Sequence, residues 1–122
     1  MTFTPNSPAA LGFRMPAEWV PHRGTWLSWP HREPSWPGTF GPVPAVFVEI
    51  VRHLVPHEEV HINVAGDTME TVVRELLTAG DVPLTGPSAK PRVFFHHNPT
   101  NDAWCRDHGP IFLQRETASG RK

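Results

Sequence analysis

The stretch from Glu59 to Gly80, EVHINVAGDTMETVVRELLTAG, decides the fold because its apolar period changes midway. Up to Ala65, apolar and polar residues alternate as on a strand with one buried face. We expect Asp67 to cap a following helix, with Glu70 completing a capping box and a left-handed glycine closing the helix at its far end. The stripe that predicts this helix recurs at helical spacing and comprises Met69, Val72, Val73, Leu76 and Leu77.

The residues before this stretch repeat the order of strand and helix. Residues 25–30, TWLSWP, suit a short strand that Pro30 ends. Residues 31–44 are rich in proline and glycine and predict an ordered surface loop. Pro44 is well placed to begin a helix that reaches Val55. The apolar face of this helix, expected to pack on a sheet, comprises Val43, Phe47, Ile50 and Leu54.

Two further strands are predicted beyond Gly80. One is expected around Arg92 to His96 and the other at residues 111–113, with a loop between them. The order strand, helix, strand, helix, strand, loop, strand indicates a layered α/β fold, with helices at residues 44–55 and 68–79. We expect a flexible leader at residues 1–12, a folded portion at 13–115 and a polar tail at 116–122.

Composition restricts the possible partners. The 11 Lys and Arg nearly balance the 12 Asp and Glu, and no basic run is present, which argues against nucleic acid. No apolar run reaches the ~18 residues of a membrane span, and the N-terminus lacks signal-peptide features, so a cytoplasmic protein is predicted. A single cysteine, Cys105, excludes an internal disulfide and a multi-thiolate zinc site.

The loop from Asn101 to Pro110, NDAWCRDHGP, concentrates the chemistry. Asp107 and Trp104 could together bind a planar cation, since a carboxylate meets a guanidinium with two parallel hydrogen bonds and an indole face attracts it. The alternative is structural. Asp107 would then pair with Arg106 or cap backbone amides, and Trp104 would fill the core.

The histidines raise the possibility of a metal site. His53 and His57 have the spacing of a helical ligand pair, but Pro56 between them should end the helix. His96 and His97 should point to opposite faces of a strand. No metal site is therefore expected.

Cys105 admits two interpretations. Its closeness to His108 and to charged residues could favour a nucleophilic thiolate. A free cysteine is, however, more often a packing residue.

Four motifs, taken in order, resemble the N-terminal part of the agmatine deiminase family, which is grouped with the bacterial-type peptidylarginine deiminases. They are MPAEW at 15–19, TWLSWP at 25–30, WPG at 36–38 and NDAWCRDHGP at 101–110. The resemblance implies a pentein, or α/β propeller, of strand and helix modules around a guanidine site, present here in truncated form. It also implies hydrolysis of agmatine to N-carbamoylputrescine and ammonia in putrescine and polyamine biosynthesis, with no metal or organic cofactor.

The resemblance assigns roles to residues of the loop. Asp107 matches the carboxylate that holds the substrate guanidinium, and Trp104 matches the indole that lines the pocket. Cys105 does not match the family's nucleophile, which follows a glycine-rich segment near the C-terminus, while the general-acid histidine lies mid-chain. Neither segment occurs here, so no catalytic residue is expected in this chain. Residues expected to support the loop are Asn101, Asp102, Arg106 and Gly109.

Two alternatives remain open. The chain, expected to be a truncated gene product or a fragment, could be a non-catalytic remnant or binding module that associates with another chain. It could also derive from a protein-arginine deiminase, because the residues that read the far end of the substrate lie outside this sequence.

Overall fold

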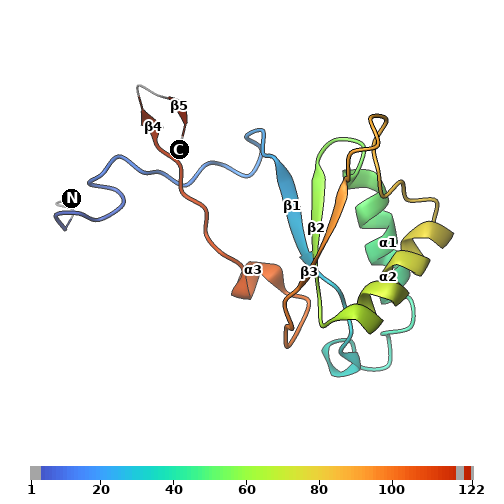
Figure 1. Cartoon of the computed structure of the whole chain (residues 1–122). Coiled ribbons are helices and arrows are strands. Elements are labelled where there is room, and N and C mark those ends of the chain that lie inside the picture. The colour runs from blue at the N-terminus through green and yellow to red at the C-terminus, as the bar shows by residue number, and fades with distance from the viewer. Residues whose placement is uncertain (1–3, 118–119, 122) are drawn as a thin grey trace. The chain divides into compact units, whose positions relative to one another are not determined.

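The structure, a computed structural model, describes residues 4–117 and 120–121. The chain divides into two compact units (Figure 1). One unit, His22–His108, contains the main sheet and the long helices, and the other is formed by Met1–Pro21 together with Gly109–Lys122. No helix in the described residues is long and apolar enough to cross a membrane.

The main sheet has three parallel strands in the order β1-β2-β3. They are β1 (Gly24–Ser28), β2 (Glu59–Val64) and β3 (Val93–His97). Thr25 pairs with Val60, and Val60 pairs in turn with Val93. The predicted order of strand, helix, strand, helix, strand is therefore confirmed for this unit.

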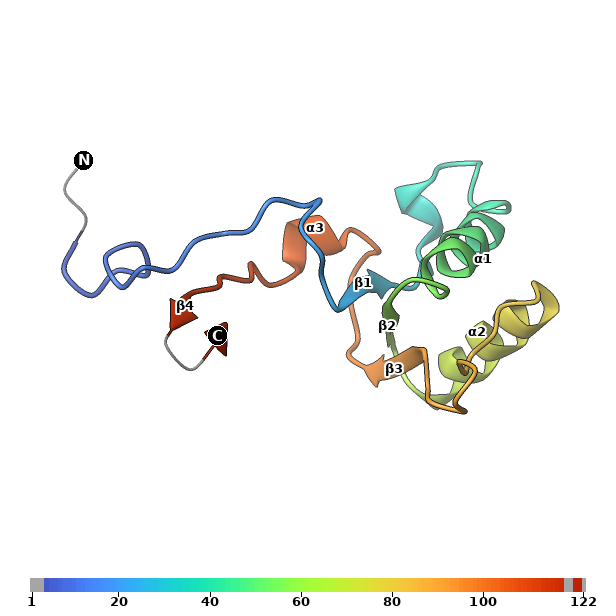
Figure 2. The ribbon, with the colours of Figure 1, turned by 90° about the horizontal axis from the view of Figure 1, so that it is seen from above.

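Both long helices, α1 (Val43–Leu54) and α2 (Asp67–Ala79), lie on one face of the sheet (Figure 2). This arrangement follows from the parallel strands. The connection between two parallel strands must return from the end of one strand to the start of the next, and a helix in that connection buries its apolar side against the sheet. The apolar residues on this side are nearly all aliphatic. The core comprises Trp29, Val48, Val51, Val55, Val60, Ile62, Val64, Val73, Leu77, Val82 and Val93.

Only part of each predicted helix face packs against the core. In α1, Val48 and Val51 are buried, whereas Ile50 remains 38% exposed. In α2, Val72 and Leu76 are 49% and 37% exposed. The apolar stripe of each helix is wider than its contact with the sheet, and a 3.6-residue period cannot show which side of a wide stripe is covered.

The predicted capping box of α2 is wrong. Gly66 is the N-cap residue, Asp67 is already helical, and no side chain caps the helix. Glu70 instead accepts hydrogen bonds from Arg74 Nε at 2.7 Å and from His97 Nε2 at 2.7 Å. Hydrogen bonds between charged groups are stronger than a bond to a backbone amide, so Glu70 turns away from the helix start.

Gly80 is required by packing rather than by a left-handed backbone. Its φ is −89°, and Asp81 after it adopts the positive φ of 55°. A Cβ on Gly80 would lie 2.4 Å from Cγ1 of Val48. The glycine therefore lets the end of α2 approach α1 closely.

The predicted strand at residues 111–113 is also wrong. These residues have no regular structure, and Ile111 and Phe112 are 75% and 65% exposed. A strand needs a partner for its backbone groups, and none of the described strands runs beside this segment. After it come a single bridge from Gln114 to Arg14 and the antiparallel pair β4 (Glu116–Thr117) and β5 (Gly120–Arg121).

Candidate functional site

The loops that follow β1 and β3 contact each other, and this contact places the NDAWCRDHGP loop. The first loop contains a short 3-10 turn, η1 (Glu33–Ser35), and the second contains one helical turn, α3 (Cys105–His108). The second loop is thus partly helical rather than irregular as predicted. Carboxyl ends of parallel strands are where open α/β sheets usually bind ligands.

Asp102 is fixed by hydrogen bonds to both oxygens of its carboxylate. Ser35 Oγ donates to Oδ2 at 2.6 Å, and the Ala103 amide donates to Oδ1 at 2.8 Å. The pKa of Asp102 lies below its ordinary value, chiefly because of the Ser35 hydroxyl, with the Ala103 amide and the charges of Arg32 and His31 adding to the effect. Asp102 therefore links the two loops.

Aromatic rings make a second link between the loops. The rings of Trp36 and Trp104 lie 5.4 Å apart between centroids, and Phe40 lies 5.8 Å from Trp36 on its own loop. Arg32 Nη1 also donates to the carbonyl of Asn101, at 3.5 Å. Trp104 nevertheless remains 51% exposed, so the interpretation that it fills the core is wrong.

A chain of polar side chains fixes α3 to the sheet, on the side away from α1 and α2 (Figure 2). Cys105 Sγ lies 3.1 Å from Oγ of the fully buried Ser28. Asn63 Nδ2 donates to the same hydroxyl at 3.3 Å, and Asn98 Nδ2 donates to Asn63 Oδ1 at 3.0 Å. Cys105 thus anchors the helical turn that carries Asp107.

Of the two residues predicted to bind a cation, Asp107 lies on this turn and Trp104 immediately precedes it. Asp107 is exposed, and its amide donates to the carbonyl of Trp104 at 2.9 Å. An exposed carboxylate and an exposed indole one turn apart can both reach a planar cation. Two of the predicted supporting residues lie at the end of this loop. Arg106 is exposed and is engaged in interactions with other groups. Gly109 is half-buried and is the first residue of the C-terminal segment of the other unit.

An aromatic stack across the open face of the sheet was not anticipated. Trp26 stacks on His61 and on His96 at 4.8 and 4.5 Å, and His61 Nδ1 lies 3.0 Å from His96 Nε2. Burial, and then the neighbouring His61, lower the pKa of His96. His97 points to the opposite face and bonds Glu70, as its strand position predicted. Within the described part of the chain, no three metal-ligating side chains converge.

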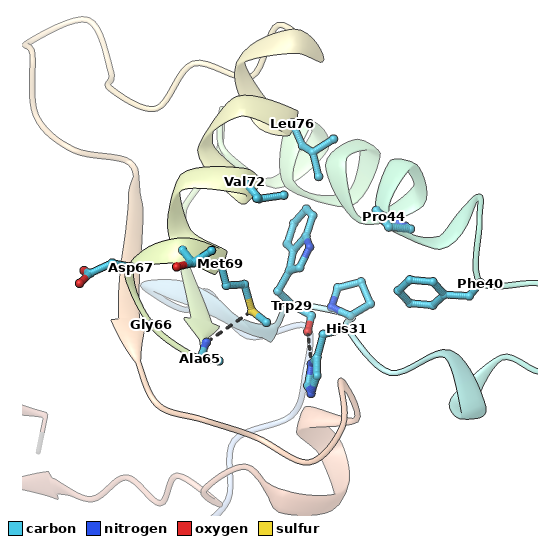
Figure 3. Close-up of a pocket in the computed structure, with 12 residues that line it drawn as sticks. Trp29, His31, Phe40, Pro44, Ala65, Gly66, Asp67, Met69, Val72 and Leu76 are labelled. Atoms are coloured by element: carbon cyan, nitrogen blue, oxygen red, sulfur yellow. Dashed lines mark hydrogen bonds between the residues drawn. The ribbon is translucent and has the colours of Figure 1, made fainter.

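A pocket of about 620 Å³ lies on the helix side of the sheet, between α1, α2 and the loop after β1 (Figure 3). Its lining is mostly apolar and includes Trp29, Phe40, Met69, Val72 and Leu76. His31 faces it but is engaged with the Trp29 carbonyl at 3.0 Å. Neither Trp104 nor Asp107, the residues predicted to bind a cation, lines this pocket.

Comparison with known proteins identifies relatives of the chain. Agmatine deiminases of Ectopseudomonas mendocina and Pseudomonas aeruginosa are 34% and 33% identical over 113 and 108 residues, covering 93% and 88% of this chain. The chain spans only 27% and 26% of their lengths. A solved agmatine deiminase of Enterococcus faecalis superposes with a TM-score of 0.72 at 26% identity, over 93% of this chain and 28% of that one.

The family assignment is based on nearly the whole sequence. The family model of the Porphyromonas-type peptidyl-arginine deiminases matches residues 14–121. That range includes both contacting loops and every strand of the main sheet. The chain therefore belongs to the Porphyromonas-type peptidyl-arginine deiminase family.

Proposed function

We propose that this chain is the N-terminal portion of an agmatine deiminase-like hydrolase with a pentein fold, and that its loop 101–108 binds the substrate guanidinium. The observation that carries the proposal is the exposure of Trp104 and Asp107, three residues apart in a loop held at Asp102 and Cys105. The names of the relatives support agmatine as the substrate. The complete reaction would convert agmatine and water to N-carbamoylputrescine and ammonia, toward putrescine.

The proposed role of the loop is orientation. A guanidinium is fully protonated at neutral pH, and two parallel hydrogen bonds to Asp107 would fix its plane while the Trp104 indole attracts its face. A fixed plane exposes the guanidinium carbon to attack from one side. Binding and orientation are therefore the contribution proposed for this chain.

Hydrolysis needs two further groups. A thiolate must attack the guanidinium carbon, and an acid must protonate the departing ammonia. Cys105 is poorly suited to the first role, because its sulfur lies 3.1 Å from the Ser28 hydroxyl, against the sheet. We propose that both groups come from segments outside this sequence, so this chain binds the guanidinium without hydrolysing it.

Binding can be tested on the 122-residue chain by following tryptophan fluorescence during titration with agmatine. We expect a dissociation constant of tens of millimolar or weaker, since an exposed ion pair and a cation–π contact each contribute about 1 kcal/mol or less. Putrescine, which has no guanidinium, is the control ligand and should bind more weakly. Asp107→Asn should weaken agmatine binding, whereas Asp67→Asn, at a fully exposed carboxylate outside the loop, should not. Equal responses to agmatine and putrescine would refute the proposal.

Peptidyl arginine is a second candidate substrate, favoured by the description of the matching family. Such a substrate presents the same guanidinium but carries amide groups in place of the agmatine ammonium. Titration with N-acetyl-arginine amide therefore separates the two candidates. Tighter binding of this compound than of agmatine would favour protein-arginine deimination.

A further inference from the structure

The turn after β1 contacts the site loop through neighbouring residues. Ser35 bonds the Asp102 carboxylate at 2.6 Å, and Trp36 lies against Trp104 at 5.4 Å. We propose that Ser35 and Trp36 are positioning residues, which hold loop 101–108 in the conformation that binds a guanidinium. This inference rests on the function proposed above for the loop.

The first step of the argument concerns Asp102. Its two oxygens accept from Ser35 Oγ and from the Ala103 amide, so its carboxylate is occupied within the loop contact. Ala103 is buried, with 8% of its surface exposed, which makes this end of the contact rigid. The hydrogen bond from Ser35 therefore fixes the backbone immediately before Trp104.

The second step concerns the Trp104 indole. Trp36 lies against it at an interplanar angle of 32°, and Phe40 lies beside Trp36. The indole still has 51% of its surface exposed, which leaves room for a cation. Trp36 thus restricts the Trp104 side chain and leaves part of it accessible.

The third step concerns the energy of binding. A loop that is ordered before its ligand arrives loses less conformational entropy on binding. Loop 101–108 is held near its start by Ser35 and Trp36, and at Cys105 by Ser28. Loss of the Ser35 hydroxyl should therefore weaken guanidinium binding even though Ser35 itself is not expected to touch the ligand.

The experiment compares agmatine binding by the wild-type chain, Ser35→Ala, Ser35→Thr and Thr78→Ala. Thr78 provides the matched control, because its hydroxyl donates to a helix carbonyl of α2, that of Arg74, at 2.8 Å. We expect Ser35→Ala to weaken binding about threefold, since a loop without this hydrogen bond must be ordered when the ligand binds. Ser35→Thr keeps a hydroxyl and should restore most of the affinity, and Thr78→Ala should have no effect. Unchanged affinity in Ser35→Ala would overturn the proposal.

A second readout follows Asp102 itself by carbon NMR during a pH titration. The groups facing its carboxylate are the Ser35 hydroxyl, the Ala103 amide, and the charged Arg32 and His31. The pKa of Asp102 is held below the ordinary ~3.9 of an aspartate, and Ser35→Ala should raise it toward that value. Thr78→Ala should leave it unchanged. An unmoved midpoint in Ser35→Ala would contradict the proposed contact.

The two proposals fail in different ways. If wild-type protein does not respond to agmatine, the guanidinium-binding function fails. The positioning role is then tested by the NMR resonance of the Trp104 indole N–H in the absence of ligand. Relative to wild type, this resonance must shift or broaden in Ser35→Ala and recover in Ser35→Thr. An indole resonance identical in all variants would refute the positioning role.

Discussion

Single residues of the site differ in how far the sequence could predict them. Trp104 and Asp107 were identified from a motif, whereas Ser28 and Ser35 were not singled out. Their partners, Cys105 and Asp102, lie 77 and 67 residues away along the chain, and local patterns carry no information about such contacts. The stack of Trp26, His61 and His96 could have been predicted more easily, because strand alternation places each of them on the open face.

Cys105 gives a prediction at this scale. Cys105→Ala removes a partner of the buried Ser28 hydroxyl and should lower the free energy of unfolding by about 1 kcal/mol. Cys105→Ser replaces the thiol with a hydroxyl, keeps a hydrogen-bonding group at the same position and should cost less. Urea unfolding of both variants measures the difference, and a larger loss in Cys105→Ser would contradict the anchoring role.

Secondary-structure elements were predictable where their period was clear. The order of β1, α1, β2, α2 and β3 follows from apolar patterns that change from alternation to helical spacing. The covered face of each helix was predicted only in part and the missing strand at 111–113 was not, because both depend on which surfaces meet. Gly80 illustrates this limit, since its neighbour Val48 belongs to another helix.

The contact between α1 and α2 gives a prediction at the element scale. Gly80→Ala would place a methyl group 2.4 Å from Cγ1 of Val48. We expect a loss of stability of about 1 to 3 kcal/mol, the usual cost of overpacking. The control is the thermal unfolding of the double variant that combines Gly80→Ala with Val48→Ala. Its loss should be smaller than the sum of the two single losses, and simple additivity would argue against direct contact.

At the scale of the whole molecule, this sequence accounts for about a quarter of the length of its relatives. Exposed apolar side chains include Trp19 at 88% and Ile111 at 75%. Trp29, by contrast, is buried at 4% exposure against Phe47. The sheet and the covered sides of α1 and α2 therefore form a core of their own, while Val72 of α2, at 49% exposure, adds to the exposed apolar surface.

The purified chain should self-associate and show no deiminase turnover. Large exposed apolar side chains recruit other surfaces, so light scattering should report a mass that rises with concentration. Replacing Ile111 and Phe112 together with serine should reduce the rise. Turnover is measured with a colorimetric assay for the ureido product that hydrolysis of agmatine would release. A monodisperse monomer, or turnover that disappears in Cys105→Ala, would contradict this account.

The central claim, that Trp104 and Asp107 bind a guanidinium, is tested most directly by NMR of the tryptophan indole N–H groups. The chain has 5 tryptophans, which can be assigned by substitution. During titration with agmatine, the account predicts that the Trp104 indole resonance shifts most, that Trp19 and Trp29 stay in place, and that Asp107→Asn abolishes the shift. A Trp104 resonance that does not move, or that moves equally in Asp107→Asn, would contradict it.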